Sequence, residues 1–399
     1  MKHNTVFAIA LSLGLSTAVA ATGSQANLPR YRVAAVPSPA AADAGCLPGH
    51  TVRTVPRGIN DHGSVAADYL CFKVAANGIP LAQFSQGFVW SPRFGAQLMP
   101  RAAEVRDVNA VSVNNRGEVF GREVTLQGAA YGVEWSLHGG YERIFVAPPE
   151  CSNIDSAAAG SVFGYVVGYG LRPDAASGGC AVKWLIRTPV GEIREGPAGG
   201  QAWDINFWNF AVGDAGSAAV RVHAPSGNTQ VLFAGDATTF GRAQDINDQG
   251  EVAGYLSLQN KFCGQATAAS WDRSGQMMSL PHLAGQVSSR AHAIGADEVV
   301  GQSGPGQYCA LPYGEAERAV LWKGRRTVDL NTLVPQWLNI TLMRAVGVNG
   351  AGQIVALGFR DDEPLAGCPV LSWDENDNPV LDYSTPCRNL HIFVLTPVH

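Results

Sequence analysis

The sequence predicts an all-β fold built from repeats, a seven-bladed β-propeller of four-stranded blades, and three observations support this prediction. A turn motif recurs along the chain, a strand ending in tryptophan follows most copies, and glycine is abundant while charged residues are few. The chain has 399 residues, of which 46 are glycine, and only 15% are charged. This composition suits a turn-rich fold with a large core, and long amphipathic helical patterns are absent.

The turn motif is clearest in residues 246–254, which read Ile-Asn-Asp-Gln-Gly-Glu-Val-Ala-Gly. Asn and Asp hydrogen-bond to nearby backbone, and glycine adopts positive φ without a Cβ clash, so this segment predicts a tight turn between two strands. Similar segments occupy 59–65, 113–121 and 348–355, and more divergent ones occupy 154–164, 205–213 and 294–301. In the copy at 205, Asn209 replaces the turn glycine, and Asn is the next residue that tolerates this conformation.

The spacing of the copies sets the predicted architecture. They begin at residues 59, 113, 154, 205, 246, 294 and 348, so successive steps are 54, 41, 51, 41, 48 and 54 residues. A period of roughly 40–50 residues is typical of one propeller blade. We therefore expect one blade for each copy.

The third strand of most copies ends in tryptophan. We expect these residues to pack between sheets with each indole N–H bonded to a backbone acceptor, and we prefer this to a sugar-stacking row. The recurring Asn is likewise interpreted as a turn former and not as a ligand. The predicted third strands are 87–90, 132–135, 181–184, 219–222, 268–271 and 319–322, of which 219–222 lacks the tryptophan.

The two ends of the domain are predicted to meet. Residues 31–36 form an apolar strand before the first copy, and residues 391–398 form a strand with no fourth strand after it. A ring of blades exposes two sheet edges unless the termini share one blade. We therefore expect the segment near Tyr31 to pair with the C-terminal strand and close the ring.

The first residues have the pattern of an export signal. A basic start is followed by an apolar core at 6–15 and by Ala18-Val19-Ala20, which predicts a signal peptide over 1–21 and a single propeller domain over 30–399. No later segment approaches ~18 consecutive apolar residues, so no membrane span is expected in the mature chain. The protein is thus predicted to be secreted or periplasmic. Its formal net charge of -5 argues against a nucleic-acid partner.

The cysteines support export. Their number is eight and none forms a Cys-x-x-Cys pair, which favours disulfides over a zinc or redox site. On the predicted topology all of them lie on the face that carries the long loops. The simplest connectivity is sequential: Cys46 with Cys71, Cys151 with Cys180, Cys263 with Cys309, and Cys368 with Cys387.

The motif Ile-Asn-Asp-x-Gly-x-Val-x-Gly, the third strand ending in Trp, and the segment Val-Asp-Leu-Asn-Thr-Leu at 328–333 resemble the HAF repeats of bacterial extracellular proteins. The end of the chain, with Gly-Gln-Ile-Val at 352–355 and His-Ile-Phe-Val-Leu-Thr-Pro at 391–397, is also similar to that family. This resemblance implies export and a repeat-built β fold. It implies no particular activity and no catalytic residues. The insertion around 368–387 departs from the family pattern.

The long-loop face is where we expect ligand binding, because loops held by a rigid scaffold commonly carry it. Four residues before the Ile of each copy stand Val55, Asn109, Glu150, Gln201, Arg242, Arg290 and Arg344, so three successive blades aim an arginine at one channel mouth. Two residues further along the strand the series includes Arg57, Trp203, Gln244 and His292. Tyr308 and Trp337 are expected on the same face, whereas Trp208 belongs to the opposite one.

Several functions are compatible with this arginine crescent. Guanidinium groups bind carboxylate or sulfate bidentately, which favours an acidic extracellular polysaccharide as ligand. Alternatively, the arginines pair with Asp245, Glu150 or backbone carbonyls and only join the blades. A third hypothesis is a polysaccharide-active enzyme of the uronate lyase type, with His292 or Tyr308 as base or acid, and a fourth is a structural surface protein without ligand. No motif indicates a metal or another cofactor.

Overall fold

The structure is a computed structural model of the chain. It describes residues 28–41, 43–46, 50–74, 80–136, 139–152, 154–258, 265–306, 316–367, 370–373, 379–382 and 386–398. The predicted signal peptide, Cys263, Cys309, Cys368 and Tyr308 lie outside these residues. The side chain of Cys387 does so too, so the third and fourth predicted disulfides stay predictions.

The described chain is all-β and consists of four-stranded antiparallel sheets, the arrangement found in β-propellers. Five such sheets are separate, and an eight-stranded sheet divides into two four-stranded halves that share only the parallel bridge between Gln86 and Val108. We number these units 1 to 7 in the order in which the turn motifs occur. Within each unit, strands A to D run from the centre outward.

The units comprise the following strands. Unit 1 is β2 (Thr51–Ile59), β3 (Val65–Val74), β4 (Pro80–Ser91) and β5 (Gly95–Leu98), and unit 2 is β6 (Val105–Val113), β7 (Glu118–Thr125), β8 (Ala130–Ser136) and β9 (Tyr141–Phe145). Unit 3 is β10 (Ser156–Gly160), β11 (Val166–Asp174), β12 (Gly179–Arg187) and β13 (Ile193–Ala198), and unit 4 is β14 (Ala202–Ile205), β15 (Phe210–Ala215), β16 (Ala218–His223) and β17 (Thr229–Phe233).

Unit 5 is β18 (Thr239–Ile246), β19 (Val252–Leu258), β20 (Ala266–Trp271) and β21 (Met277–Ser279), and unit 6 is β22 (Ser288–Ile294), β23 (Val299–Gly304), β24 (Arg318–Lys323) and β25 (Arg326–Asp329). Two 3-10 helices, η2 (Leu330–Thr332) and η3 (Gln336–Leu338), lead to unit 7. That unit is β26 (Ile340–Val348), β27 (Ile354–Arg360), β32 (His391–Val398) and β1 (Arg30–Ala35). The inserted strands β28 (Ala366–Gly367), β29 (Val370–Trp373), β30 (Pro379–Asp382) and β31 (Pro386–Cys387) form two small separate sheets.

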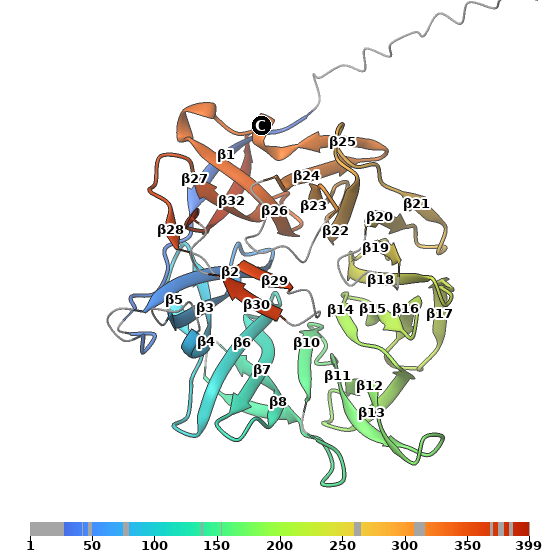
Figure 1. Ribbon diagram of the computed structural model, residues 1–399. Helices are drawn as coiled ribbons and strands as arrows, with labels where there is room; N and C mark the ends of the chain where they lie inside the picture. Colours follow the sequence, from blue (N-terminus) through green and yellow to red (C-terminus); the bar gives the residue numbers. More distant parts are fainter. Residues whose placement is uncertain are drawn as a thin grey trace, which may run out of the picture.

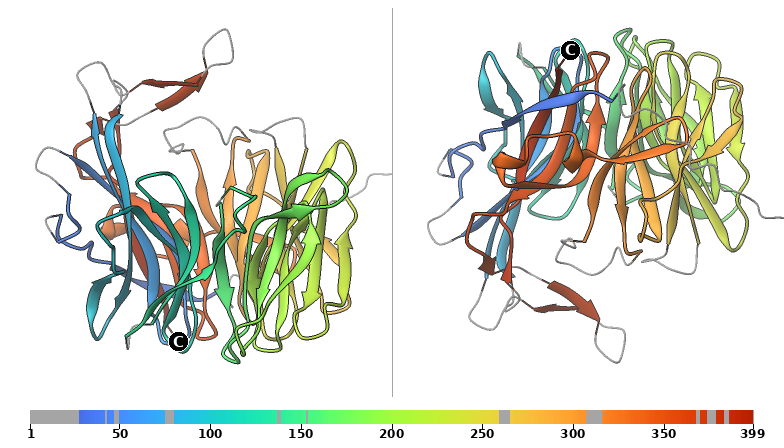
Figure 2. Two further views of the ribbon diagram at one scale, coloured as in Figure 1. Left: turned by 90° about the horizontal axis from the view of Figure 1, so that it is seen from below. Right: turned by 90° about the horizontal axis from the view of Figure 1, so that it is seen from above.

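The units surround a common centre, and the insertion with β29 and β30 projects from one side of the disc (Figures 1 and 2). The N-terminal strand β1 pairs antiparallel with the C-terminal strand β32, from Arg30 opposite Val398 to Ala35 opposite Phe393. Tyr31 is buried, and its N–H donates to the carbonyl of Leu333 at 3.0 Å. The predicted pairing of the two ends is thus observed.

The recurring Asn shapes its own turn. In unit 1 the Asn60 Oδ1 accepts hydrogen bonds from the backbone N–H of His62 and Ser64 at 3.1 and 2.9 Å, and Gly63 adopts a φ of 75°. Asn209 at the equivalent turn position of unit 4 has a φ of 62°, as its replacement of glycine predicted. The turn role assigned to this Asn from sequence is confirmed.

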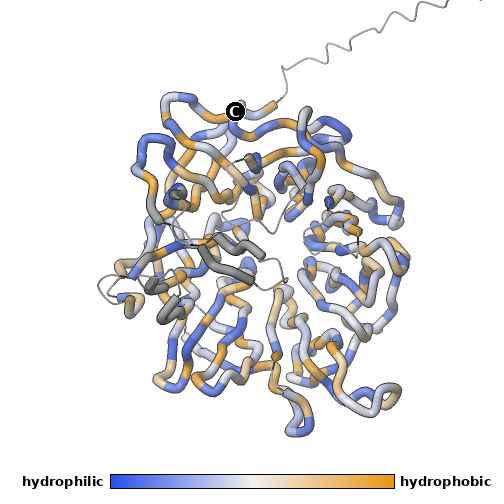
Figure 3. Tube along the Cα trace, viewed as in Figure 1, coloured by the Kyte–Doolittle hydropathy of each residue, from blue (hydrophilic) through white to orange (hydrophobic). Residues whose placement is uncertain are grey.

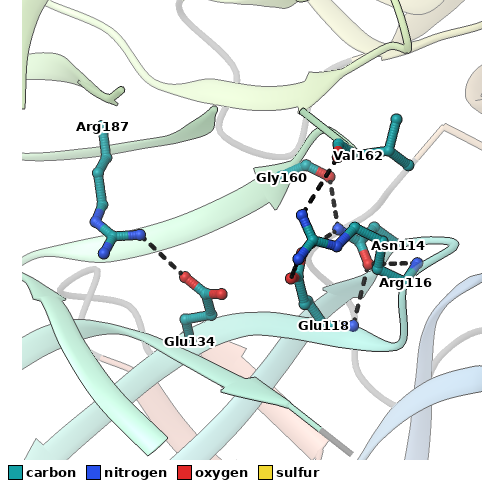
Figure 4. Close-up of polar contacts among 7 residues, drawn as sticks. All are labelled: Asn114, Arg116, Glu118, Glu134, Gly160, Val162 and Arg187. Atoms are coloured by element: carbon teal, nitrogen blue, oxygen red, sulfur yellow. Dashed lines mark hydrogen bonds and ion pairs between the residues drawn. The ribbon is translucent and has the colours of Figure 1, made fainter. Parts of the chain in front are cut away.

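The same Asn has a second role that the sequence did not reveal, because its Nδ2 donates to a backbone carbonyl of the next unit. The bonds run from Asn60 to Asn114, Asn114 to Gly160, Asn206 to Asn247 and Asn247 to Gly295, at 2.9, 3.2, 2.9 and 2.7 Å. Figure 4 shows the bond from Asn114 to Gly160, beside the Arg116 bond to Val162. Asn349 of unit 7 donates to Asn60 of unit 1 at 2.9 Å, so the last unit is linked to the first.

The third copy of the motif was placed in the wrong register. Its turn runs through Ser161 and Gly164, with Ser161 N–H bonded to Tyr165 and Gly164 N–H bonded to Ser161, as in the other copies. Ile154 forms only an isolated bridge with Ala130, and the copy therefore begins at 160 and not at 154. The error arose because glycine and serine replace Ile and Asn there, which left Ile154-Asp155 as the nearest sequence match.

The predicted third strands lie within β4, β8, β12, β16, β20 and β24. Trp184, Trp271 and Trp322 are fully buried, and their Nε1 atoms donate to the carbonyls of Asp214, Leu232 and Pro281 at 2.7, 3.1 and 2.7 Å. Each acceptor belongs to a neighbouring unit or to the connection beside it. The packing role predicted for these residues is confirmed, and Figure 3 shows apolar segments along the strands with hydrophilic turns at the periphery.

Two of the predicted disulfides are present, Cys46–Cys71 and Cys151–Cys180, with Cα–Cα distances of 5.8 and 5.9 Å. Cys71 lies toward the end of β3 and Cys180 at the start of β12, in each case far from the A–B turn. Both bridges therefore fix the long-loop face. In the described part of the chain, no helix has the length and apolar character needed to cross a membrane.

Candidate functional site

A β-bulge recurs in the innermost strand of every unit, and it selects the residues that face the centre. In each A strand a residue close to the turn has no partner on strand B. It lies two positions before the first residue of the turn motif, and the bulge changes the direction of its side chain. These residues are Arg57, Val111, Ala158, Trp203, Gln244, His292 and Val346. The four that sequence spacing singled out, Arg57, Trp203, Gln244 and His292, are all bulge residues.

Six of the bulge residues line one cavity of about 380 Å³, which we call the long-loop cavity. Arg57, Trp203, Gln244, His292 and Arg344 come from five different units and meet there. Val111, Val346 and Leu357 supply apolar wall. The structure thus brings together five of the nine residues predicted to bind ligand.

Arg242 and Arg290 occupy the strand position of Arg344 in units 5 and 6 but do not line this cavity. The Arg242 guanidinium stacks on Trp203 at 4.6 Å and forms an ion pair with Asp214 at 3.1 Å. Arg290 lies over the Tyr255 ring at 4.8 Å. The predicted crescent is therefore a row in which one arginine reaches the cavity directly and Arg242 supports Trp203 from behind.

Carboxylates balance most of this positive charge. Arg57 pairs with Asp68 at 2.7 Å and Arg344 pairs with Glu317 at 3.3 Å, and both acids are buried. The partners proposed from sequence were wrong in detail. Asp245 has no arginine partner among the ion pairs of the described residues. Glu150 does not hold the predicted position, because the third copy of the motif begins at 160 and not at 154. The acids that pair come from B strands and from the segment before β24, positions that the turn motif does not mark.

His292 is held as a neutral ring. Burial, together with the neighbouring Arg344 and Arg290, lowers the pKa of His292 to about 3, against the opposing effect of a hydrogen bond to Gln302 Oε1 at 2.9 Å. The Gln302 amide donates in turn to Glu317 Oε1 at 3.2 Å, so its oxygen faces the imidazole. A ring with so low a pKa is a weak base near neutral pH, which counts against His292 as the base of a lyase.

Asp204 and Asp245 stand at the waist of the central channel, because they line both the long-loop cavity and a second cavity on the opposite side. Asp204 Oδ2 accepts from the N–H of Ile246 at 3.1 Å, and Asp245 Oδ2 accepts from the N–H of Ile294 at 2.7 Å. Burial and the adjoining Asp204 carboxyl raise the pKa of Asp245 well above its ordinary value. Asp245 therefore keeps its proton to a higher pH than an ordinary carboxyl does. Sequence reasoning treated Asp245 only as an arginine partner and missed this pair.

The remaining predicted residues lie elsewhere. Trp337 is 78% exposed in η3 and lines neither cavity. Tyr308 is outside the described residues. Among the described side chains, no group of three or more His, Cys, Asp or Glu residues could hold a metal ion.

Comparisons with known proteins give a likeness of fold. No family model matches the chain, and no curated protein matches it. Among solved structures it is similar to the β-propeller domain of the Trilobed protease from Pyrococcus furiosus, with 10% identity, a TM-score of 0.47, and coverage of 84% of this chain and 99% of that one.

Two further structures are of the same degree of similarity. An acylaminoacyl peptidase from Pyrococcus horikoshii has 11% identity and a TM-score of 0.49 over 84% of this chain, which spans about half (52%) of the peptidase. A protein of unknown function from Dyadobacter fermentans has 9% identity and a TM-score of 0.46, with coverage of 93% of this chain and 100% of that one.

Proposed function

We propose that this protein is an exported, closed seven-bladed β-propeller that binds a carboxylate-bearing carbohydrate, such as a uronate end group of an extracellular polysaccharide, in its long-loop cavity. The observation that carries the proposal is the convergence of Arg57, Trp203, Gln244, His292 and Arg344 from five units on one cavity. The link from Asn349 to Asn60 supports closure of the ring. The two disulfides support export, because such bridges persist in oxidising compartments.

The chemistry of the wall matches a sugar acid. Trp203 offers an aromatic surface, fixed by its Nε1 bond to Asp214 at 2.8 Å and by Arg242 behind it. Gln244 supplies an amide that makes no hydrogen bond within the described residues, so both its donor and its acceptor groups are available. A cavity of about 380 Å³ lies in the size range of small-molecule sites, so it suits one or two sugar rings and not a threaded polymer.

The arginines remain able to bind a carboxylate although they are paired. A guanidinium has five N–H donors, and a single carboxylate occupies at most two of them. The Arg57 side chain is 41% exposed and the Arg344 side chain 24% exposed, whereas their partners Asp68 and Glu317 are buried. Because Asp68 and Glu317 already balance these arginines, and Asp204 and Asp245 also line the cavity, it does not favour a densely sulfated polymer.

Introduction of a charge at Gln244 tests this proposal without disturbing an ion pair. The probe is digalacturonate, with digalactose as the neutral control, measured by isothermal titration calorimetry. We expect Gln244→Glu to weaken digalacturonate binding at least tenfold and Gln244→Lys to preserve or strengthen it. Arg326→Gln, at an exposed position of strand β25, is the matched control and should leave binding unchanged.

Two results would count against the proposal. Equal affinity for digalactose and digalacturonate would show that the arginines do not recognise the carboxylate. Absence of binding by the wild type to any uronate oligomer would favour a structural protein, and ultraviolet-absorbing unsaturated products would instead favour the lyase. Because His292 is a weak base, a lyase would need another residue as its base.

A further inference from the structure

A second cavity of about 290 Å³ opens among the A–B turns on the face opposite the long loops, and we call it the turn-face cavity. Its lining comes from all of the numbered units and differs in charge from the long-loop cavity. The charged residues in its described lining are all acidic: Asp61, Asp204, Asp245 and Asp248. No arginine, lysine or histidine side chain is part of that described lining. The surroundings therefore repel anions and favour a cation.

An exposed aromatic cluster borders the turn-face cavity. Phe163, Phe207 and Trp208 are 51%, 41% and 59% exposed, and Phe207 is itself part of the cavity lining. The Phe207 ring packs edge-to-face on Phe163 at 4.9 Å and on Trp208 at 5.2 Å. Three large apolar side chains gathered at a cavity mouth are unlike the scattered exposed residues of an ordinary surface. Exposed aromatic groups of this kind commonly anchor a binding partner.

The aromatic cluster is fixed directly against an acid. Trp208 Nε1 donates to the backbone carbonyl of Asp248 at 3.0 Å, and the N–H of Phe207 donates to Asp248 Oδ1 at 2.9 Å. The second carboxylate oxygen of Asp248 makes no hydrogen bond within the described part of the chain. The neighbouring Gln249 side chain is also exposed and likewise unbonded there. An aromatic surface and an available carboxylate thus stand side by side at the rim.

The other polar groups of the cavity are already satisfied. The carboxamides of Asn114, Asn247 and Asn349 each bond to the next unit and to a side chain of their own turn. A neutral sugar would therefore find few free amide groups to hydrogen-bond. What remains available is the Gln249 amide and the carboxylate oxygen of Asp248 beside aromatic carbon, and a carboxylate next to an aromatic surface suits a cationic group on an aliphatic stem.

We propose that the turn-face cavity binds a lysine or arginine side chain presented by a segment of a partner protein. The aliphatic stem packs on Phe207 and Trp208 at the rim, and the cationic head enters among the carboxylates. The cavity volume of about 290 Å³ accommodates one long side chain. The aromatic cluster provides the surface that a partner's backbone and flanking residues cover.

Occupancy by a cation has a consequence at the waist of the channel. Asp204 and Asp245 face Asp61 and Asp248 on one side, and on the other side Arg57, Arg344 and the neutral His292. A cation arriving from the turn face favours ionisation of Asp245. Where Asp245 is protonated before binding, binding of the cation releases that proton.

The test uses a pentapeptide, acetyl-Gly-Gly-Lys-Gly-Gly-amide, and its isosteric neutral analogue with norleucine in place of lysine. Binding is followed by the indole N–H signals in ¹H–¹⁵N spectra of the folded full-length protein, with the Trp208 signal assigned through Trp208→Phe. We expect the lysine peptide to shift the Trp208 signal and the norleucine peptide to bind at least tenfold more weakly. Asp248→Asn should weaken the lysine peptide about tenfold, and Gln249→Glu should strengthen it.

Matched controls test whether the effect is specific to this cavity or is shared by other aromatic and acidic residues on the turns. Phe94 is another exposed aromatic residue on a turn, and Asp297 is an exposed acid in the turn of unit 6. Phe94→Ala and Asp297→Asn should leave lysine-peptide binding unchanged. Calorimetry at acidic pH in buffers of different ionisation heat should show proton release that Asp245→Asn abolishes.

The proposal is overturned if the norleucine and lysine peptides bind equally. It is also overturned if Asp248→Asn leaves the lysine peptide unaffected while its spectrum remains that of the folded protein. Binding of a neutral oligosaccharide to the aromatic cluster without binding of the lysine peptide would identify a glycan surface instead. None of these outcomes depends on the long-loop cavity, because the variants and the probes are different.

Discussion

The two cavities of the central channel share a waist but differ in charge and in the way the chain builds them. The long-loop cavity is lined by bulge residues, which include arginine, glutamine, tryptophan and histidine. The turn-face cavity is lined by the turn motif itself, which supplies Asn and Asp. In the turn motif, most polar side chains already hydrogen-bond to the next unit or to their own turn. At the bulge position, by contrast, the residue type differs from one unit to the next. The repeated motif therefore determines the residues of the turn face, whereas the residues of the long-loop face can differ between units and so can form a specific binding site.

The largest expected effect concerns the ring that holds both cavities together. Asn349→Ala removes the bond to Asn60 and those within its own turn, and it leaves buried backbone groups without partners. We expect a loss of about 3 kcal/mol in the free energy of unfolding, measured by chemical denaturation. Asn115→Ala is the control, because Asn115 is exposed and bonds to Asp61 at the rim. Equal losses in the two variants would show that this Asn is not what joins unit 7 to unit 1.

The next effect distinguishes a structural arginine from a binding one. Arg242→Gln leaves the buried Asp214 carboxyl without its ion pair, and we expect a loss of about 2 kcal/mol at pH 7. Burial raises the pKa of Asp214 while Arg242 lowers it, so the variant raises this pKa further. A carboxyl whose pKa is higher in the folded state destabilises that state as pH rises through the folded value. The loss should therefore be smaller at pH 4 than at pH 7, and a loss that grows on acidification would contradict this account.

A smaller effect, in the pH dependence of stability, tests the neutral state of His292. Its pKa of about 3 lies below the unfolded value of about 6.5, so the unfolded state binds more protons between these values. The folded state therefore loses stability as pH falls through this window, with a slope of up to about 1.4 kcal/mol per pH unit. In urea denaturation between pH 6.5 and 4, His292→Gln should show a shallower slope than the wild type. An unchanged slope would mean that the imidazole is accessible and able to protonate.

The smallest expected effect on stability is on the turn face. Trp208→Ala removes a 59% exposed side chain and one hydrogen bond to Asp248, so we expect a change of about 0.5 kcal/mol. Thermal denaturation of the variant beside the wild type checks this. A large loss would assign the aromatic cluster to the core and remove the reason to regard it as a binding surface.

Sequence reasoning predicted the architecture well where the motif was regular. The Trp packing and the turn role of Asn are visible in local patterns, whereas the pairing of β1 with β32 was predicted from closure of the ring and the two disulfides from sequential pairing of cysteines. The prediction failed at unit 3. The turn there has the same backbone hydrogen bonds as the other turns, but Ser161 and Gly164 form it without the Ile and Asn of the motif.

The site was predicted only in part, for a physical reason. Spacing within one strand found Arg57, Trp203, Gln244 and His292, because a bulge at a fixed position gives them the same direction. The ion pairs of Arg242 and Arg344 and the Asp204–Asp245 pair depend on contacts between units. Such contacts have no fixed sequence separation, so no pattern within a single copy indicates them.

The central claim, that the two mouths recognise opposite charges through different residues, is tested most directly by Gln244→Glu and Gln249→Glu titrated with digalacturonate and with the lysine pentapeptide. The two glutamines lie in unit 5 and line the long-loop and turn-face cavities respectively. We predict that Gln244→Glu weakens digalacturonate at least tenfold with little effect on the lysine peptide, and that Gln249→Glu strengthens the lysine peptide with little effect on digalacturonate. If either variant changes both affinities to a similar extent, or neither probe responds to its own variant, the claim of two separate sites is contradicted.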